Sequence, residues 1–168
     1  NAFVLKNNVK IYGGFKGIET SFAERDLAIN DVILSGDIGT ANVTTDNCFH
    51  VVISAGLAGA NTLLDGVIIT KGYANANIVT PSITVNGQTV SPRNGGGLYK
   101  ISSITDFTDC SILENYAVAD GGGIYEFTSA NTSRYFKCDI SRNDAGSDGG
   151  GAFLNNSGSE LDSCIINL

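Results

Sequence analysis

Apolar and polar residues alternate along much of the chain, as at residues 33–35, 51–53 and 136–140. A period of two is typical of β-strands, whose successive side chains point to opposite faces. The spacing of an amphipathic helix is found only at residues 20–27, where one short helix is expected. The pattern therefore predicts an all-β protein built from short strands.

Two sequence markers recur with a common period. A glycine triplet followed by an apolar and an aromatic residue occurs at residues 95–99, 121–125 and 149–153, at spacings of 26 and 28. A cysteine followed by apolar residues occurs at 110, 138 and 164, and its first two copies end in Asn115 and Asn143. Two markers that keep one period indicate an internal repeat, which reaches back to about residue 64.

Short strands, turn residues and a repeat near 27 residues predict a parallel β-helix, a solenoid in which each repeat forms one coil. We expect one domain of roughly six coils, with N-terminal coils in residues 1–63 and regular repeats in residues 64–168. Equivalent residues should stack in columns about 4.8 Å apart. The expected inward columns are Val67, Cys110, Cys138 and Cys164, and Ile69, Ile112, Ile140 and Ile166.

Residues 75–94 interrupt this rhythm with about twenty additional residues. Within them, strand-like residues flank Asn86-Gly87, a pair that favours a two-residue type I′ hairpin. The segment is expected to project from the rod as a loop. Residues 40–47 form a second, shorter polar loop.

The repeat resembles that of the polymorphic outer-membrane proteins and related bacterial right-handed β-helix surface proteins, which combine Gly-Gly-x-aliphatic with Phe-x-x-Asn. Residues 121–124 match the first element, and residues 112–115 and 140–143 match the second with isoleucine in place of phenylalanine. The resemblance covers residues 64–168. Residues 11–52 are similar to the first coils of secreted β-helix proteins from Bacteroidetes-type bacteria.

This resemblance implies a right-handed coil and an extracellular or bacterial cell-surface location, and it carries over no catalytic residues. We expect a non-catalytic rod that acts as an adhesin or scaffold and binds carbohydrate or a protein partner through its loops. The alternative is a β-helix polysaccharide lyase or glycoside hydrolase, which needs converging carboxylates in a groove. The candidate ligand-binding residues are Asn86, Gly87, Arg93, Tyr99 and Tyr125.

Charge and hydropathy narrow the range of partners. The chain has 10 Lys and Arg against 17 Asp and Glu, for a net charge of −7, which disfavours nucleic acid as a partner. The longest nearly apolar run, residues 49–60, is too short to span a bilayer and contains Ser54, Gly56 and Gly59. The strand-like sequence at each end leads us to expect that the rest of a longer chain or a capping subunit covers the ends.

The four cysteines lack the C-x-x-C spacing of a zinc or redox site. A buried column of free thiols at 110, 138 and 164 is the favoured interpretation, with a disulfide between coils and metal binding as alternatives. Cys48 lies off this column and is expected in the core.

Polar side chains also recur at the turns of the repeat. Asn115 and Asn143 are expected to stack and bond backbone groups. Asp120 and Asp148 precede two glycine triplets, where they cap turns or, together with Asp144, hold calcium through their oxygens. Calcium is the one cofactor that the sequence suggests.

Overall fold

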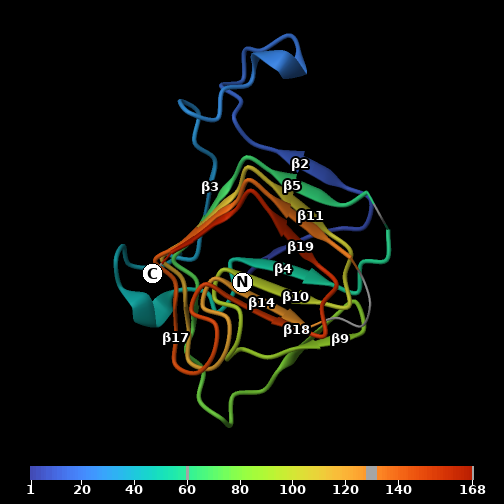
Figure 1. The fold of residues 1–168 in the computed structure, drawn as a ribbon. Helices are drawn as coiled ribbons and strands as arrows, with labels where there is room; N and C mark the ends of the chain where they lie inside the picture. The colour runs from blue at the N-terminus through green and yellow to red at the C-terminus, as the bar shows by residue number, and fades with distance from the viewer. Residues whose placement is uncertain (60, 128–131, 168) are drawn as a thin grey trace.

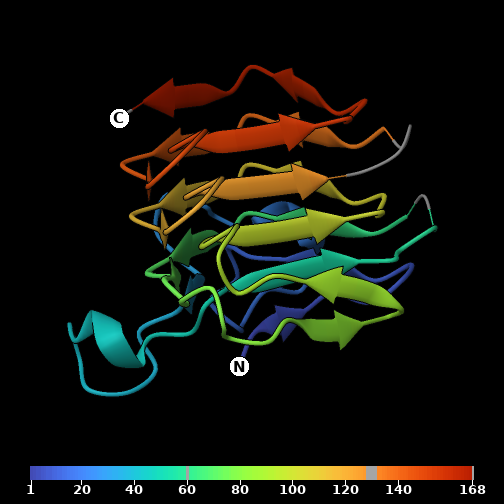
Figure 2. The same ribbon diagram turned by 90° about the horizontal axis from the view of Figure 1, so that it is seen from below.

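The computed structural model describes residues 1–59, 61–127 and 132–167. Each coil crosses three parallel sheets in turn, and the coils stack into a right-handed rod (Figures 1 and 2). Sheet A contains β1 (Phe3–Val4), β4 (Val52–Ala55), β10 (Leu98–Ile101), β14 (Ile124–Phe127) and β18 (Ala152–Asn155). Sheet B contains β2 (Lys10–Tyr12), β5 (Leu63–Asp65), β11 (Asp106–Thr108), β15 (Arg134–Phe136) and β19 (Glu160–Asp162).

Sheet C contains β3 (Ile33–Ser35), β6 (Ile68–Thr70), β12 (Ser111–Leu113), β16 (Asp139–Ser141) and β20 (Ile165–Asn167). A smaller sheet D contains β7 (Tyr73–Ala74), β13 (Tyr116–Ala117) and β17 (Asp144–Ala145). The predicted parallel β-helix is thereby confirmed. Within the described ranges the chain has no helix long and apolar enough to cross a membrane.

The strands of the described part of the chain make five coils, where the repeat length predicts roughly six. The difference arises because residues 15–31 and 37–47 leave the first coil as two excursions, drawn in blue and cyan in Figure 1. Only 3₁₀ turns form in them, at Phe22–Glu24 and Thr44–Asp46, so the helix expected over residues 20–27 is reduced to a single turn. Arg25 ties the first excursion to the rod through a salt bridge of 2.5 Å to Asp65.

Several corners of the coil are turned by a residue with positive φ. Gly66 and Asp109 occupy this conformation directly after β5 and β11, with φ of 70° and 46°. Lys71, Glu114 and Arg142 do so after the strands of sheet C. Because these corners stack, Lys71 and Arg142 both contact the Glu114 carboxylate, at 2.6 and 3.3 Å.

The inward columns follow the predicted register. Ile69, Ile112 and Ile140 pair in order along sheet C and are completely buried. Cys110 and Cys138 are buried inside the coil, while Cys164 in the last coil is partly exposed. All four cysteines are free thiols, as the favoured interpretation predicted for Cys110, Cys138 and Cys164, and Cys48 is buried in the core as expected.

The glycine triplets allow the coil to be narrow at the corner between sheets D and A. A Cβ atom on Gly96 would lie 2.2 Å from the Tyr116 carbonyl oxygen, and one on Gly122 would lie 2.0 Å from the Asp144 carbonyl oxygen. Such distances are far below van der Waals contact, so the middle glycine of these two triplets tolerates no side chain. Glycine is therefore a steric requirement of the fold at these two positions.

The asparagines form the predicted ladder next to these triplets. The buried Asn115 side chain accepts a hydrogen bond from the Gly72 N–H at 2.9 Å and donates one to the Ile69 carbonyl at 3.1 Å. Asn143 Oδ1 in turn accepts from the Asn115 N–H at 3.0 Å. Each amide thus satisfies backbone groups at a corner where ladder bonds are interrupted. This explains why the glycine and asparagine markers share one period.

The insertion forms the predicted hairpin, with strands β8 (Ile83–Val85) and β9 (Gln88–Val90). Asn86 and Gly87 have φ of 48° and 77°, as a type I′ turn requires. Residues 75–82 extend away from the coil, but the hairpin folds back along sheet A near β4 (Figures 1 and 2). Val90 is completely buried there, so the hairpin also covers part of the rod.

Candidate functional site

A column of aromatic rings lies on the outer face of sheet A. Tyr99, Tyr125 and Phe153 are paired in register on β10, β14 and β18. The ring centroids of Tyr99 and Tyr125 are 5.0 Å apart, and those of Tyr125 and Phe153 are 5.5 Å apart. The last two rings are parallel to within 2°, so the coil spacing alone holds them in a stack.

A polar column accompanies the rings. Asn94, Asp120 and Asp148 each directly precede a glycine triplet, and the side chains of Asn94 and Asp120 each cap the turn of the next coil. The Asp120 N–H donates to Asn94 Oδ1 at 3.2 Å, and the Asp148 N–H donates to Asp120 Oδ1 at 3.3 Å. Asp120 therefore caps a turn as expected, and Asp148 donates its backbone N–H to that cap.

The repeat brings the two columns together. In every copy, the polar residue and the aromatic ring are separated by the triplet and one apolar residue. The first glycine of each triplet has a φ between 65° and 67°, which turns the chain sharply before the strand of sheet A begins. Burial raises the pKa of the Tyr125 hydroxyl, and the Asp120 charge adds to this rise because the two groups are close.

The hairpin covers the N-terminal part of the aromatic column. Ile53, Tyr99 and Val90 form a small apolar cluster between the hairpin and sheet A. Asn86 Nδ2 donates to the Ala55 carbonyl at 3.0 Å, and the Tyr99 hydroxyl donates to the Thr89 carbonyl at 3.4 Å. Tyr99 is only 3% exposed as a result.

These contacts show which of the predicted ligand-binding residues are exposed and which are covered or support the fold. Asn86 and Gly87 lie at the exposed tip of the hairpin, and Arg93 donates to the Ala76 carbonyl at 2.8 Å, which holds the base of the insertion. Tyr99 is covered, whereas Tyr125 is partly exposed. The partly exposed Phe153 was not among the candidates, although it occupies the same place in the third copy of the motif.

A cavity of about 400 Å³ lies between the insertion and sheet A. Its wall is mainly apolar, formed by Phe49, His50, Ile53, Pro81, Ile83 and Val90 among others. The His50 ring is 4% exposed, and its Nδ1 lies 2.9 Å from the Gly95 carbonyl oxygen. Burial lowers the pKa of His50 to about 4.

This histidine should make stability depend on pH. Its pKa is 6.5 in the absence of burial and about 4 in the fold, so the unfolded chain binds more protons between these values. The free energy of unfolding should therefore fall as the pH drops through this window, by up to about 3 kcal/mol. Urea unfolding of the wild type and of His50→Asn, which keeps a donor for Gly95, measures the difference. Equal pH dependence of the two proteins would contradict the prediction.

The predicted calcium residues do not form a cluster of three ligands. Asp144 lies on β17 beside Tyr116, and the Asp120 carboxylate caps the turn at Asp148. In the described part of the chain, no three His, Cys, Asp or Glu side chains come together as a metal site would require. Calcium binding stays a prediction.

An ion pair that the sequence analysis did not foresee lies inside the coil. Lys100 Nζ is 2.8 Å from Glu126 Oε1, and both side chains are completely buried. Tyr135 donates to Glu126 Oε2 at 2.9 Å, and Ser157 and Ser159 donate to Oε1 at 2.6 and 2.5 Å. Burial raises the pKa of the Glu126 carboxyl, but the ammonium and hydroxyl groups outweigh it and the pKa is lowered overall.

The fold and these columns define a parallel β-helix whose repeat carries paired aromatic and polar residues on one outer face. Searches with family models, among curated proteins and among solved structures found no match to this chain.

Proposed function

We propose that the chain is a non-catalytic rod of an exported bacterial cell-surface protein, which binds carbohydrate along the outer face of sheet A. The support is the double column: Tyr125 and Phe153 are partly exposed beside Asp120 and Asp148. Aromatic rings provide apolar contact for the C–H groups of a sugar, and carboxylates accept hydrogen bonds from its hydroxyls. The export and surface location rest on the resemblance of the repeat.

The charge of the chain favours a neutral ligand. At a net charge of −7, an acidic polysaccharide would be repelled as it approached the aspartates. The columns repeat with each coil, so they offer an extended chain of sugars several equivalent contacts in a row. A linear, neutral polysaccharide is therefore the proposed ligand, and a protein partner bound through the loops is the alternative.

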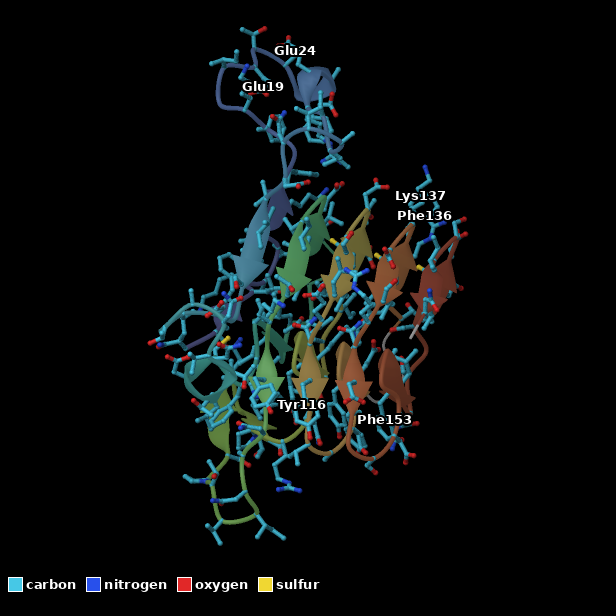
Figure 3. All side chains as sticks on the ribbon, turned by 90° about the vertical axis from the view of Figure 1, so that its left-hand side faces the viewer. Glu19, Glu24, Tyr116, Phe136, Lys137 and Phe153 are labelled. Atoms are coloured by element: carbon cyan, nitrogen blue, oxygen red, sulfur yellow. The ribbon has the colours of Figure 1, made fainter. Side chains whose placement is uncertain are left out.

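Affinity electrophoresis in gels that contain a neutral or a uronic-acid polysaccharide tests this proposal. We expect the neutral polymer to retard the protein, and Tyr125→Ala or Phe153→Ala to weaken binding roughly tenfold. The matched control is Phe136→Ala, which removes an aromatic ring from sheet B; Figure 3 shows Phe136 and Phe153 on different sides of the coil.

Two results would overturn the proposal. Equal loss of binding in the Phe136→Ala protein would place the ligand elsewhere. Release of new sugar ends from any polymer by the purified protein would instead show a lyase or a hydrolase. Adding and chelating calcium during the same measurements tests the predicted role of Asp120, Asp144 and Asp148.

A further inference from the structure

The cavity beside the insertion is enclosed by the segment that interrupts the regular repeat. Most of its wall comes from residues 49–53 on the rod and residues 81–92 in the insertion. Figures 1 and 2 show the hairpin of β8 and β9 along sheet A near β4, while the rest of the insertion extends away from the coil. The insertion therefore converts part of an outer sheet face into a cavity of about 400 Å³.

The lining of this cavity is suited to an uncharged molecule. Phe49 and Ile53 contribute apolar side chains from the rod, and Ile83 and Val90 contribute them from the insertion. Among the described residues that line the cavity, none has a charged side chain. An ionic ligand would lose its hydration there without gaining a partner for its charge, so the lining favours a neutral, mainly apolar ligand.

His50 provides the cavity with a buried hydrogen-bond acceptor. Its Nδ1 lies 2.9 Å from the Gly95 carbonyl oxygen. A carbonyl oxygen can only accept, so the hydrogen is on Nδ1, and Nε2 of the neutral ring keeps a free electron pair. Burial lowers the pKa of His50 to about 4, so the ring is neutral at physiological pH.

No described residue donates a hydrogen bond to this electron pair. The other backbone group that acts on the ring is the Asn94 carbonyl, which is also an acceptor. The Tyr99 ring meets the His50 ring edge-on at 5.2 Å, but the Tyr99 hydroxyl donates to the Thr89 carbonyl.

The position of Nε2 leaves it accessible to a ligand. The fully buried polar atoms that lack a partner do not include Nε2, so this nitrogen keeps contact with the cavity that His50 lines. A buried acceptor without a donor costs free energy, and a ligand hydroxyl would remove that cost.

We propose that the cavity binds a small, neutral aromatic molecule with one hydroxyl group, which donates a hydrogen bond to His50 Nε2 while its rings fill the apolar space. A cavity of about 150 Å³ holds one benzene ring, so about 400 Å³ suits a molecule of two fused rings. The space between two facing β layers also favours a flat molecule.

This inference does not depend on the proposed carbohydrate binding. A sugar would bring several hydroxyl groups into the cavity, and most of them would lack a partner there. The polysaccharide proposed to bind at Tyr125 and Phe153 is therefore not expected to compete for the cavity. The two sites can be tested separately.

2-Naphthol and 2-methylnaphthalene test the hydrogen bond, because they have nearly the same shape and differ by a hydroxyl in place of a methyl group. Titrations followed by ligand fluorescence give the affinities, and thermal unfolding gives the change in Tm. We expect 2-naphthol to bind roughly tenfold more tightly than 2-methylnaphthalene and to raise Tm. Equal affinities would contradict the role of His50, and no binding of either compound would overturn the proposal.

His50→Asn separates the hydrogen bond from the shape of the cavity. Asparagine keeps a donor for Gly95 but is too short to place an acceptor where Nε2 lies. We expect the preference for 2-naphthol to disappear, while 2-methylnaphthalene binds with similar affinity in both proteins. A preference that persists in the variant would show that another group receives the hydroxyl.

Ile83→Trp tests the location. Ile83 lines the cavity and is 54% exposed, so a larger side chain there can fill the cavity without entering the core. We expect this variant to weaken 2-naphthol binding roughly tenfold or more. The matched control is Ile78→Trp, which adds the same side chain to the insertion at a position that is 87% exposed and outside the cavity lining.

Phe153→Ala distinguishes the cavity from the aromatic column. Phe153 does not line the cavity, so its removal should leave 2-naphthol binding unchanged. Loss of binding in Phe153→Ala, or full binding in Ile83→Trp, would place the probe outside the cavity and overturn the proposal.

Discussion

Alanine at Gly122 should cost about 4 kcal/mol or more of unfolding free energy and should prevent cooperative folding in moderate urea. The new Cβ would lie 2.0 Å from the Asp144 carbonyl oxygen and 2.7 Å from the Gly150 carbonyl oxygen. Both atoms belong to the backbone, so the clash can be relieved only by moving two coils apart. That movement would also strain the asparagine ladder at the same corner.

The repeat itself supplies the control for this experiment. Gly150 has the same place in the next triplet, but a Cβ there would meet nothing closer than the Asn143 carbonyl oxygen at 3.1 Å. Gly150→Ala should therefore cost about 1 kcal/mol or less. Urea unfolding followed by circular dichroism compares the two variants, and similar midpoints would show that the narrow corner does not limit the fold.

The coil could be predicted because its physical requirements recur in the sequence. The triplets of glycine are needed where backbones approach, and Asn115 and Asn143 are needed where backbone groups lack ladder partners. Both requirements return once per coil, so they appear as spacings of 26 and 28 residues. The coil register followed directly from those spacings.

The position of the hairpin could not be predicted in the same way. Its strands and its turn are local features, and Asn86-Gly87 is sufficient to indicate them. Its packing depends on Ile53 and Tyr99, which face outward from sheet A and belong to other coils. No periodic signal links these residues to Val90. The sequence therefore could not predict that the hairpin covers Tyr99.

The sequence contains a pattern that indicates the buried ion pair. Lys100 and Glu126 are 26 residues apart, the spacing of two triplets, and each directly follows the outward-facing tyrosine. Alternation along a strand then places both side chains inward on neighbouring coils. A lysine and a glutamate that face inward at equivalent positions of neighbouring coils indicate a buried ion pair.

Methionine at Lys100 should destabilise the fold by about 3–5 kcal/mol, because it leaves the Glu126 carboxylate buried without its cation. Three hydroxyl donors would remain, from Tyr135, Ser157 and Ser159, but none of them carries a compensating charge. The matched control is Lys71→Met, which removes the cation from the exposed bridge to Glu114. That change should cost about 1 kcal/mol or less, because water solvates both of its groups.

The double variant Lys100→Met/Glu126→Gln distinguishes the charge from the packing. Glutamine keeps an oxygen that accepts from the hydroxyls and needs no counter-ion, so the double variant should be more stable than Lys100→Met alone. Urea unfolding of the wild type, both single variants and the double variant gives the coupling energy. If Lys100→Met cost no more than Lys71→Met, the Glu126 carboxyl would have to be protonated or reached by water in the variant. The pair would then contribute little to holding adjacent coils in register.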